Sequence, residues 1–368
     1  MYVCILLFAA VFAAKVCVAV GACFALSAIL LLSVGAEFWD SGYSFPANDY
    51  YRLKNAQSGM YLDVPNASTS NIYPVIQYPY HGGNNQLWYL NRYSGDVYSF
   101  TPTHRPNSYL NVYMEYTTSG TNIGVYGQSV ASANSKWRII PNREDGASSQ
   151  LSGSYRLEAS YASGKVAKAI TNVQSAPVQL MNYSDNSATS PTQFDEWIFF
   201  TSGNVPVSLM NEHLVDSGKH LDLKFASDVP QAFKLNILQT AGTWNGQKPG
   251  VIRDNTSNQF VTDITVEMAS DAALKGAVAS TTPSGKIRLN TKYFNEDSNN
   301  WYSLSESQRK MTCAHELGHA LGLNHQHEGY DSSNVSTRKR NVMKAGTSSE
   351  FNLSEGDKAS YNLSWRKY

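Results

Sequence analysis

Four of the chain's eight histidines lie within the thirteen residues from His315 to His327. In the run TCAHELGHALGLNHQH, His315 and His319 are four residues apart, so on an α-helix both imidazoles project from one face, one turn apart. Gly322 supplies the left-handed residue that commonly ends a helix, and the chain then turns to bring His325 back to the same point. Three imidazoles at one point are ligands for a single Zn²⁺ ion with its fourth tetrahedral position open.

Glu316 follows the first of these histidines and is expected in the same cleft. Water in an open zinc position has its pKa lowered to about 7, and a neighbouring carboxylate can take its proton as the water attacks a carbonyl. The sequence therefore predicts a hydrolase with one zinc cofactor and Glu316 as its catalytic base. The alternative is an incidental histidine-rich helix end, which the fixed spacing disfavours. We expect His327 to lie outside the ligand set, in a solvated turn.

The helix that must hold these residues has signals for its start. Either Ser303 with Glu306 or Ser305 with Gln308 forms a capping box there. Upstream, Pro230 opens a helix-like spacing of apolar residues. Strands are expected within residues 220–225, 259–269, 276–281 and 285–294, which are bounded by Gly, Pro and Asn. Together these elements predict a mixed α+β region.

The pattern His315-Glu316-x-x-His319-x-x-Gly322-x-x-His325 resembles that of the metzincin metalloproteases, and its details resemble the matrixin branch. The resemblance covers residues 219–368 and implies a catalytic domain at 217–368 that hydrolyses protein or peptide substrates. It implies that Met343 forms the turn beneath the zinc, with ordinary core packing as the alternative. It further implies that substrate pairs along the edge strand GAVAST. Calcium is not indicated.

The first half of the chain repeats itself three times between residues 48 and 202. YRLKNAQSGMYLDV, NSYLNV and YRLEASYASGK are echoes of one another, and each precedes a tryptophan: Trp88, Trp137 and Trp197, spaced 49 and then 60 residues apart. Short alternating runs between turn residues predict three all-β units. Three units that each bury one tryptophan at the same place predict a closed pseudo-threefold barrel.

These repeats resemble the ricin B-type lectin family, a β-trefoil in which each lobe carries a Gln-x-Trp motif. The resemblance covers residues 47–201, and only the first lobe keeps the motif intact, as Gln86-Leu87-Trp88. It implies a sugar site in that lobe made by Asp63, Tyr78 (or Tyr80), Asn85 and Gln86. The alternative for Asp63 and Tyr78 is a turn cap and a surface aromatic.

The other two lobes lack the carboxylate that this resemblance requires. Asn111 takes its place in the second lobe, and Lys168 stands near that position in the third. A carboxylate accepts two hydroxyl protons from a sugar, whereas Asn offers one acceptor and Lys none. We therefore expect one working sugar site rather than three.

Residues 1–36 differ from the rest of the chain. Lys15 is the only charge between Tyr2 and Ala36, and residues 16–36 are apolar for long enough to cross a bilayer. The segment ends in small residues that a signal peptidase accepts. We expect a secretory signal, with an uncleaved membrane anchor as the alternative; in both cases the remainder faces outside. Residues 202–216 break the repeat and are expected to be a linker.

Charge excludes one class of partner. Lys plus Arg and Asp plus Glu both total 29, so no net field attracts nucleic acid. We expect a secreted, monomeric, multidomain protein: an all-β trefoil that binds glycans or glycoproteins, followed by an α+β zinc endopeptidase. One alternative is a lectin or adhesin whose metalloprotease domain is catalytically silent. Another is a protease whose trefoil is a folding or protein-docking module.

Overall fold

The described residues of the computed structural model form two large hydrophobic cores and one small cluster. One is built almost wholly from residues 45–209, and the other from residues 215–365. The signal or anchor expected at residues 1–36, and also His327, lie outside the described part of the chain. Within the described part, no helix is long and apolar enough to cross a membrane. The structure describes residues 45–143, 151–183, 193–210, 213–297, 300–326, 342–343 and 352–367.

The first core is enclosed by a ring of six strands. Antiparallel pairs join β1 to β5, β5 to β6, β6 to β9, β9 to β10, β10 to β13, and β13 back to β1. The ring has no open edge, so the predicted closed barrel is confirmed. Its strands are β1 (Asp49–Asn55), β5 (Trp88–Ser94), β6 (Val97–Pro102), β9 (Trp137–Arg143), β10 (Leu151–Ala159) and β13 (Trp197–Thr201).

Three hairpins are inserted in the chain between ring strands: one between β1 and β5, one between β6 and β9, and one between β10 and β13. They approach one another through pairing of β8 with β12 and with β3 (Tyr73–Pro74). Each lobe thus has four main strands, and the arrangement occurs three times. The hairpins are β2 (Tyr61–Asp63) with β4 (Ile76–Tyr78), β7 (Ser108–Val112) with β8 (Thr121–Gly127), and β11 (Lys165–Ala169) with β12 (Val178–Asn182).

The three repeat tryptophans are fully buried, as predicted. Each indole Nε1 donates to a main-chain carbonyl in its own lobe: Trp88 to Leu62 at 3.1 Å, Trp137 to Leu110 at 3.0 Å and Trp197 to Ala167 at 3.0 Å. These carbonyl residues directly precede Asp63, Asn111 and Lys168. The bonds therefore show that those three residues hold equivalent positions. A short 3-10 turn precedes each tryptophan: η2 (Asn84–Gln86), η4 (Ala133–Ser135) and η5 (Gln193–Asp195).

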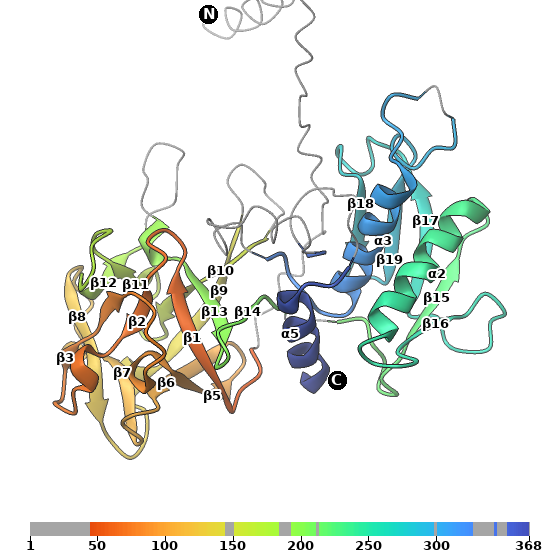
Figure 1. Cartoon of the computed structure of the whole chain (residues 1–368). Helices are drawn as coiled ribbons and strands as arrows, with labels where there is room; N and C mark the ends of the chain where they lie inside the picture. The colour runs from red at the N-terminus through yellow and green to blue at the C-terminus, as the bar shows by residue number, and fades with distance from the viewer. Residues whose placement is uncertain are drawn as a thin grey trace, which may run out of the picture. The chain divides into compact units, whose positions relative to one another are not determined.

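The second core lies between a five-stranded sheet and two helices. The sheet order is β16-β15-β17-β19-β18, parallel except for β18, which runs antiparallel to β19 at the edge. Helices α2 (Gln231–Asn245) and α3 (Glu306–Ala320) lie side by side against it (Figure 1), and Trp244 Nε1 donates to Ala314 O at 2.9 Å. The strands are β15 (Leu221–Phe225), β16 (Ile252–Asp254), β17 (Ile264–Ala269), β18 (Ala279–Thr282) and β19 (Lys286–Asn290).

Local signals define the helix ends. Ser305 and Gln308 form the capping box of α3, which decides between the two predicted boxes. Gly322 adopts φ 81° just after the helix, as expected for its end. The closing helix α5 (Glu355–Ser364), followed by the short turn η7 (Trp365–Lys367), begins with a second capping box formed by Ser354 and Asp357.

Much of the expected linker, residues 202–216, has defined structure. Its strand β14 (Pro206–Val207) pairs with β13. Leu209 then forms a bridge with Leu323, and Met210 N donates to Gly322 O at 2.8 Å. The segment is therefore held against the turn that ends α3, and it supports the position of His325.

Candidate functional site

The three histidines predicted from the sequence lie together. His315 and His319 come from successive turns of α3, and His325 follows the turn at Gly322. One ring nitrogen from each lies within 4.8 Å of the others, and His315 Nε2 is 3.0 Å from His325 Nε2. All three side chains are buried. These atoms could bind one metal ion.

Main-chain carbonyls orient two of these rings. Val342 O lies 2.7 Å from Nδ1 of His315, and Leu323 O lies 2.8 Å from Nδ1 of His319. A carbonyl only accepts, so we assign the proton to Nδ1 and a lone pair to Nε2 in each ring. His319 Nε2 is buried with no hydrogen-bond partner among the described residues. Buried nitrogens with converging lone pairs are the donor set that Zn²⁺ accepts.

The environment favours the neutral form of His315 and His319. Burial, followed by the neighbouring His319 and His325, lowers the pKa of His315 well below its usual range. Burial and then His325 lower the pKa of His319 to about 3. A metal binds the neutral imidazole, so these shifts favour binding at neutral pH.

Glu316 is a buried carboxyl group held by the edge strand. Thr281 Oγ1, from β18, lies 2.7 Å from Glu316 Oε2 and 2.9 Å from Glu316 O. The other carboxylate oxygen has no partner among the described residues. Burial raises the pKa of Glu316 to about 8, although the hydrogen bonds from Thr281 and the charge of Arg288 oppose the shift. A carboxyl group with a pKa near neutrality is suited to proton transfer.

Met343 packs against α3 at a glycine. Met343 is fully buried, and a Cβ built on Gly318 would lie far inside the normal contact distance from Met343 Sδ and 3.0 Å from Trp244 Cζ2. The close contact therefore requires glycine at position 318. Sequence reasoning missed Gly318; a glycine inside a helix, one residue before a ligand, was the available signal.

Asp357 holds the turn that contains Met343. Its carboxylate accepts from Val342 N at 2.9 Å and Met343 N at 3.2 Å, while it also caps α5 through Ser354. Val342 in turn orients His315 through its carbonyl. Asp357 thus acts on the histidine cluster through one intervening residue. Sequence reasoning missed this residue too, although the Ser-x-x-Asp capping pattern was visible.

The four predicted sugar-site residues of the first lobe also lie together. Pairing of Asp63 with Ile76 and of Tyr61 with Tyr78 places Asp63 and Tyr78 on one face of the β2–β4 hairpin. Asn85 Nδ2 donates to Asp63 Oδ1 at 3.1 Å. Gln86 Nε2 donates to Pro79 O at 2.9 Å, which fixes the loop that follows Tyr78.

His81 joins this cluster and was not predicted. Its Nε2 lies 2.9 Å from Asp63 Oδ2, and its ring meets Tyr78 edge to face at 5.9 Å. Tyr80 instead packs on Tyr61 at 5.2 Å, beneath the Arg52 guanidinium. Of the two predicted tyrosines, Tyr78 therefore contacts the histidine that lies against Asp63, whereas Tyr80 does not.

The equivalent positions of the other lobes differ in charge. In the second lobe Asn134 Nδ2 donates to Asn111 Oδ1 at 3.2 Å, which copies the Asn85–Asp63 contact without a carboxylate. In the third lobe Asp195 replaces the motif glutamine, is buried, and pairs with Arg156 Nε at 3.2 Å. Only the first lobe has a carboxylate at the Asp63 position.

Comparison with known proteins shows what part of the first region is similar to. Residues 39–126 match the family described as ricin-type beta-trefoil lectin domain-like. The designed 3-fold symmetric protein ThreeFoil is 32% identical over 41% of this chain and 96% of that chain, with a TM-score of 0.34. The ricin B-like lectin of Macrolepiota procera in complex with lactose is 17% identical over 43% and 99%, with a TM-score of 0.32. The Rhizoctonia solani agglutinin is 22% identical over 42% and 96%, with a TM-score of 0.33.

No curated protein matches the chain. The family match covers the first lobe and most of the second, and the third lobe has the same strand arrangement. Residues 39–126 are therefore similar to ricin-type beta-trefoil lectin domains, and the chain also has a second region with its own sheet, helices and histidine cluster.

Proposed function

We propose that this protein is a zinc-dependent endopeptidase whose lectin domain directs it to glycans or glycoproteins outside the cell. The convergence of His315, His319 and His325 on one point, next in sequence to the buried Glu316, carries the proposal. When bound there, Zn²⁺ would polarise a substrate carbonyl and make water more acidic.

Residues of the chain would transfer the proton, position the base and bind the substrate. Glu316 would take a proton from the attacking water and pass it to the leaving amine, a transfer that suits its raised pKa. Thr281 holds the Glu316 carboxylate in place. Its strand, β18, is the edge of the sheet, so an extended substrate can add there as a further strand.

A base substitution tests the hydrolase proposal. Glu316→Ala should keep bound zinc, because the three nitrogen ligands remain, yet lose at least about 100-fold of the hydrolysis of a denatured protein such as casein. Metal content and product mapping by mass spectrometry measure the two effects. Retention of full activity would exclude Glu316 as the base. Absence of chelator-sensitive cleavage by the wild-type chain would favour a lectin with a silent second domain.

A glycan array with the full chain tests the sugar site. Asp63→Ala removes the carboxylate held between Asn85 and His81, so any glycan signal should fall about ten-fold or more. Asn111→Ala, at the equivalent position of the second lobe, is the matched control and should bind like the wild type. Equal losses in both variants would refute a single site, and no binding by the wild type would favour a docking module.

A further inference from the structure

A second concave site lies away from the histidine cluster. It is a pocket of about 570 Å³ formed where β17 and β19 end and α2 begins. One of its residues, Phe233, contacts Arg309 in the first turn of α3. At about 1.5 Å per residue, Arg309 lies roughly 9 Å along the helix axis from His315 and roughly 15 Å from His319. The pocket is therefore separate from the proposed catalytic centre.

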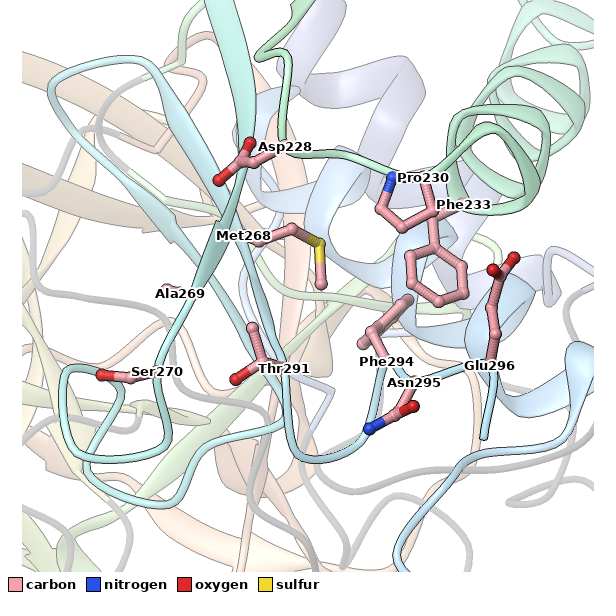
Figure 2. A pocket seen from close by; sticks show the side chains of 10 residues that line it. All are labelled: Asp228, Pro230, Phe233, Met268, Ala269, Ser270, Thr291, Phe294, Asn295 and Glu296. Carbon is pink, nitrogen blue, oxygen red and sulfur yellow. The ribbon is translucent and has the colours of Figure 1, made fainter. Parts of the chain in front are cut away.

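The floor of the pocket is apolar. Phe233 and Phe294 meet edge to face with ring centroids 5.5 Å apart, and the Met268 thioether and the Pro230 ring complete the surface. In Figure 2 the side chains of Met268, Phe233 and Phe294 converge on one space. Such a surface accepts an aliphatic or aromatic body.

The rim of the pocket is acidic. Asp228 and Glu296 are both exposed, and Figure 2 shows their carboxylates on opposite sides of the apolar floor. Neither carboxylate has a hydrogen-bond or ion-pair partner among the described residues, and no Lys or Arg lines the pocket. The nearby Lys292 pairs instead with Asp271 at 3.4 Å. The dipole of α2 favours an acid near its N-terminus, which explains one of these two residues. It does not explain a second acid on the opposite side of the pocket.

We propose that this pocket binds an arginine or lysine side chain of a polypeptide. The aliphatic stem would lie on Met268 and Phe294, and the cationic head would lie between Asp228 and Glu296. The inference rests on the proposed function, because the polypeptide is then a protein substrate held at a second point. An extended chain advances about 3.3 to 3.6 Å per residue, so the basic residue would lie about three or more residues from the scissile bond.

Methyl NMR of the full chain measures the binding directly. The chain has eight methionines, and the Met268 methyl signal is the one that Met268→Leu removes. Titration with an acetylated, amidated peptide containing one arginine should shift this signal. Its Kd should be about ten-fold below that of the same peptide with citrulline, the neutral analogue of arginine. Asp228→Asn with Glu296→Gln should abolish the preference. Asp254→Asn, an exposed acid outside the pocket, should preserve it.

Kinetics then separate the two proposals. Two substrates would share one scissile sequence and carry, about ten residues away, either arginine or citrulline. The wild type and Asp254→Asn should favour the arginine substrate several-fold in kcat/KM, and the double variant should not. If the Met268 signal does not shift, or shifts equally with both peptides, the pocket proposal is wrong even when hydrolysis is observed. Selective binding without chelator-sensitive hydrolysis supports the pocket and overturns the protease.

Discussion

Substitution of Gly318 by alanine tests how Met343 supports the histidine cluster. Gly318 lies inside α3, where helix propensity alone favours alanine by about 1 kcal/mol. The added Cβ, however, would meet Met343 Sδ far inside the ~3.5 to 4.0 Å of a normal contact, and Trp244 Cζ2 at 3.0 Å. The gain in helix propensity and the steric cost have opposite signs. The sign of the measured change in stability therefore shows whether the added Cβ meets Met343 as described.

The magnitude follows from the packing. Overfilled cores lose about 1 to 3 kcal/mol, and the turn at Met343 is fixed by Asp357, so the neighbouring atoms have little room to yield. We expect Gly318→Ala to be net destabilising by about 1 to 2 kcal/mol. Gly242 of α2 is the matched control, since a Cβ there meets nothing within 4 Å. Gly242→Ala should stabilise by about 0.5 to 1 kcal/mol.

Calorimetry of the full chain provides the assay. The chain has two cores, so the transition of the second domain is identified as the one that added zinc moves to higher temperature. Gly318→Ala should lower that Tm by several degrees relative to Gly242→Ala and should weaken zinc binding. In the Met343→Ala background the loss should disappear. If Gly318→Ala stabilises the domain as much as Gly242→Ala does, Met343 does not pack against this face of α3.

Two further predictions concern pH. Thr281→Val removes the hydroxyl beside Glu316 Oε2; because that bond stabilises the ionised carboxylate, the pKa of Glu316 should rise further, and the acid limb of kcat/KM should move to higher pH. Burial raises the pKa of Asp357 from 3.8 to about 6, against its hydrogen bonds, so between these values the folded chain holds a proton that the unfolded chain has released. The wild type should therefore lose about 2 kcal/mol of stability as pH rises from 4 to 6, relative to Asp357→Asn, in urea unfolding. Parallel curves for the two proteins would contradict the raised pKa of Asp357.

Local spacing predicted the features that depend on nearby residues. The ends of α3, the alternating strands and the three buried tryptophans follow from short-range patterns, and the structure has them where expected. The missed residues act across the chain. Gly318 meets Met343, and Asp357 meets Val342, only after α3 and α5 have packed. The strand β16 has three residues, too few to show a period.

In both candidate sites, side chains are held by hydrogen bonds to main-chain carbonyls. The place of each site residue could therefore be predicted separately from the charge of its side chain. In the trefoil, the indole bonds end on carbonyls of Leu62, Leu110 and Ala167, so these bonds do not involve the side chain that follows each of them. Asp63 and Asn111 can therefore differ in charge on the same scaffold. The substitution Asn111→Asp would test this separation: the second lobe should still fold, because Ser135 Oγ can donate to the new carboxylate, and it would then carry a carboxylate at the position equivalent to Asp63.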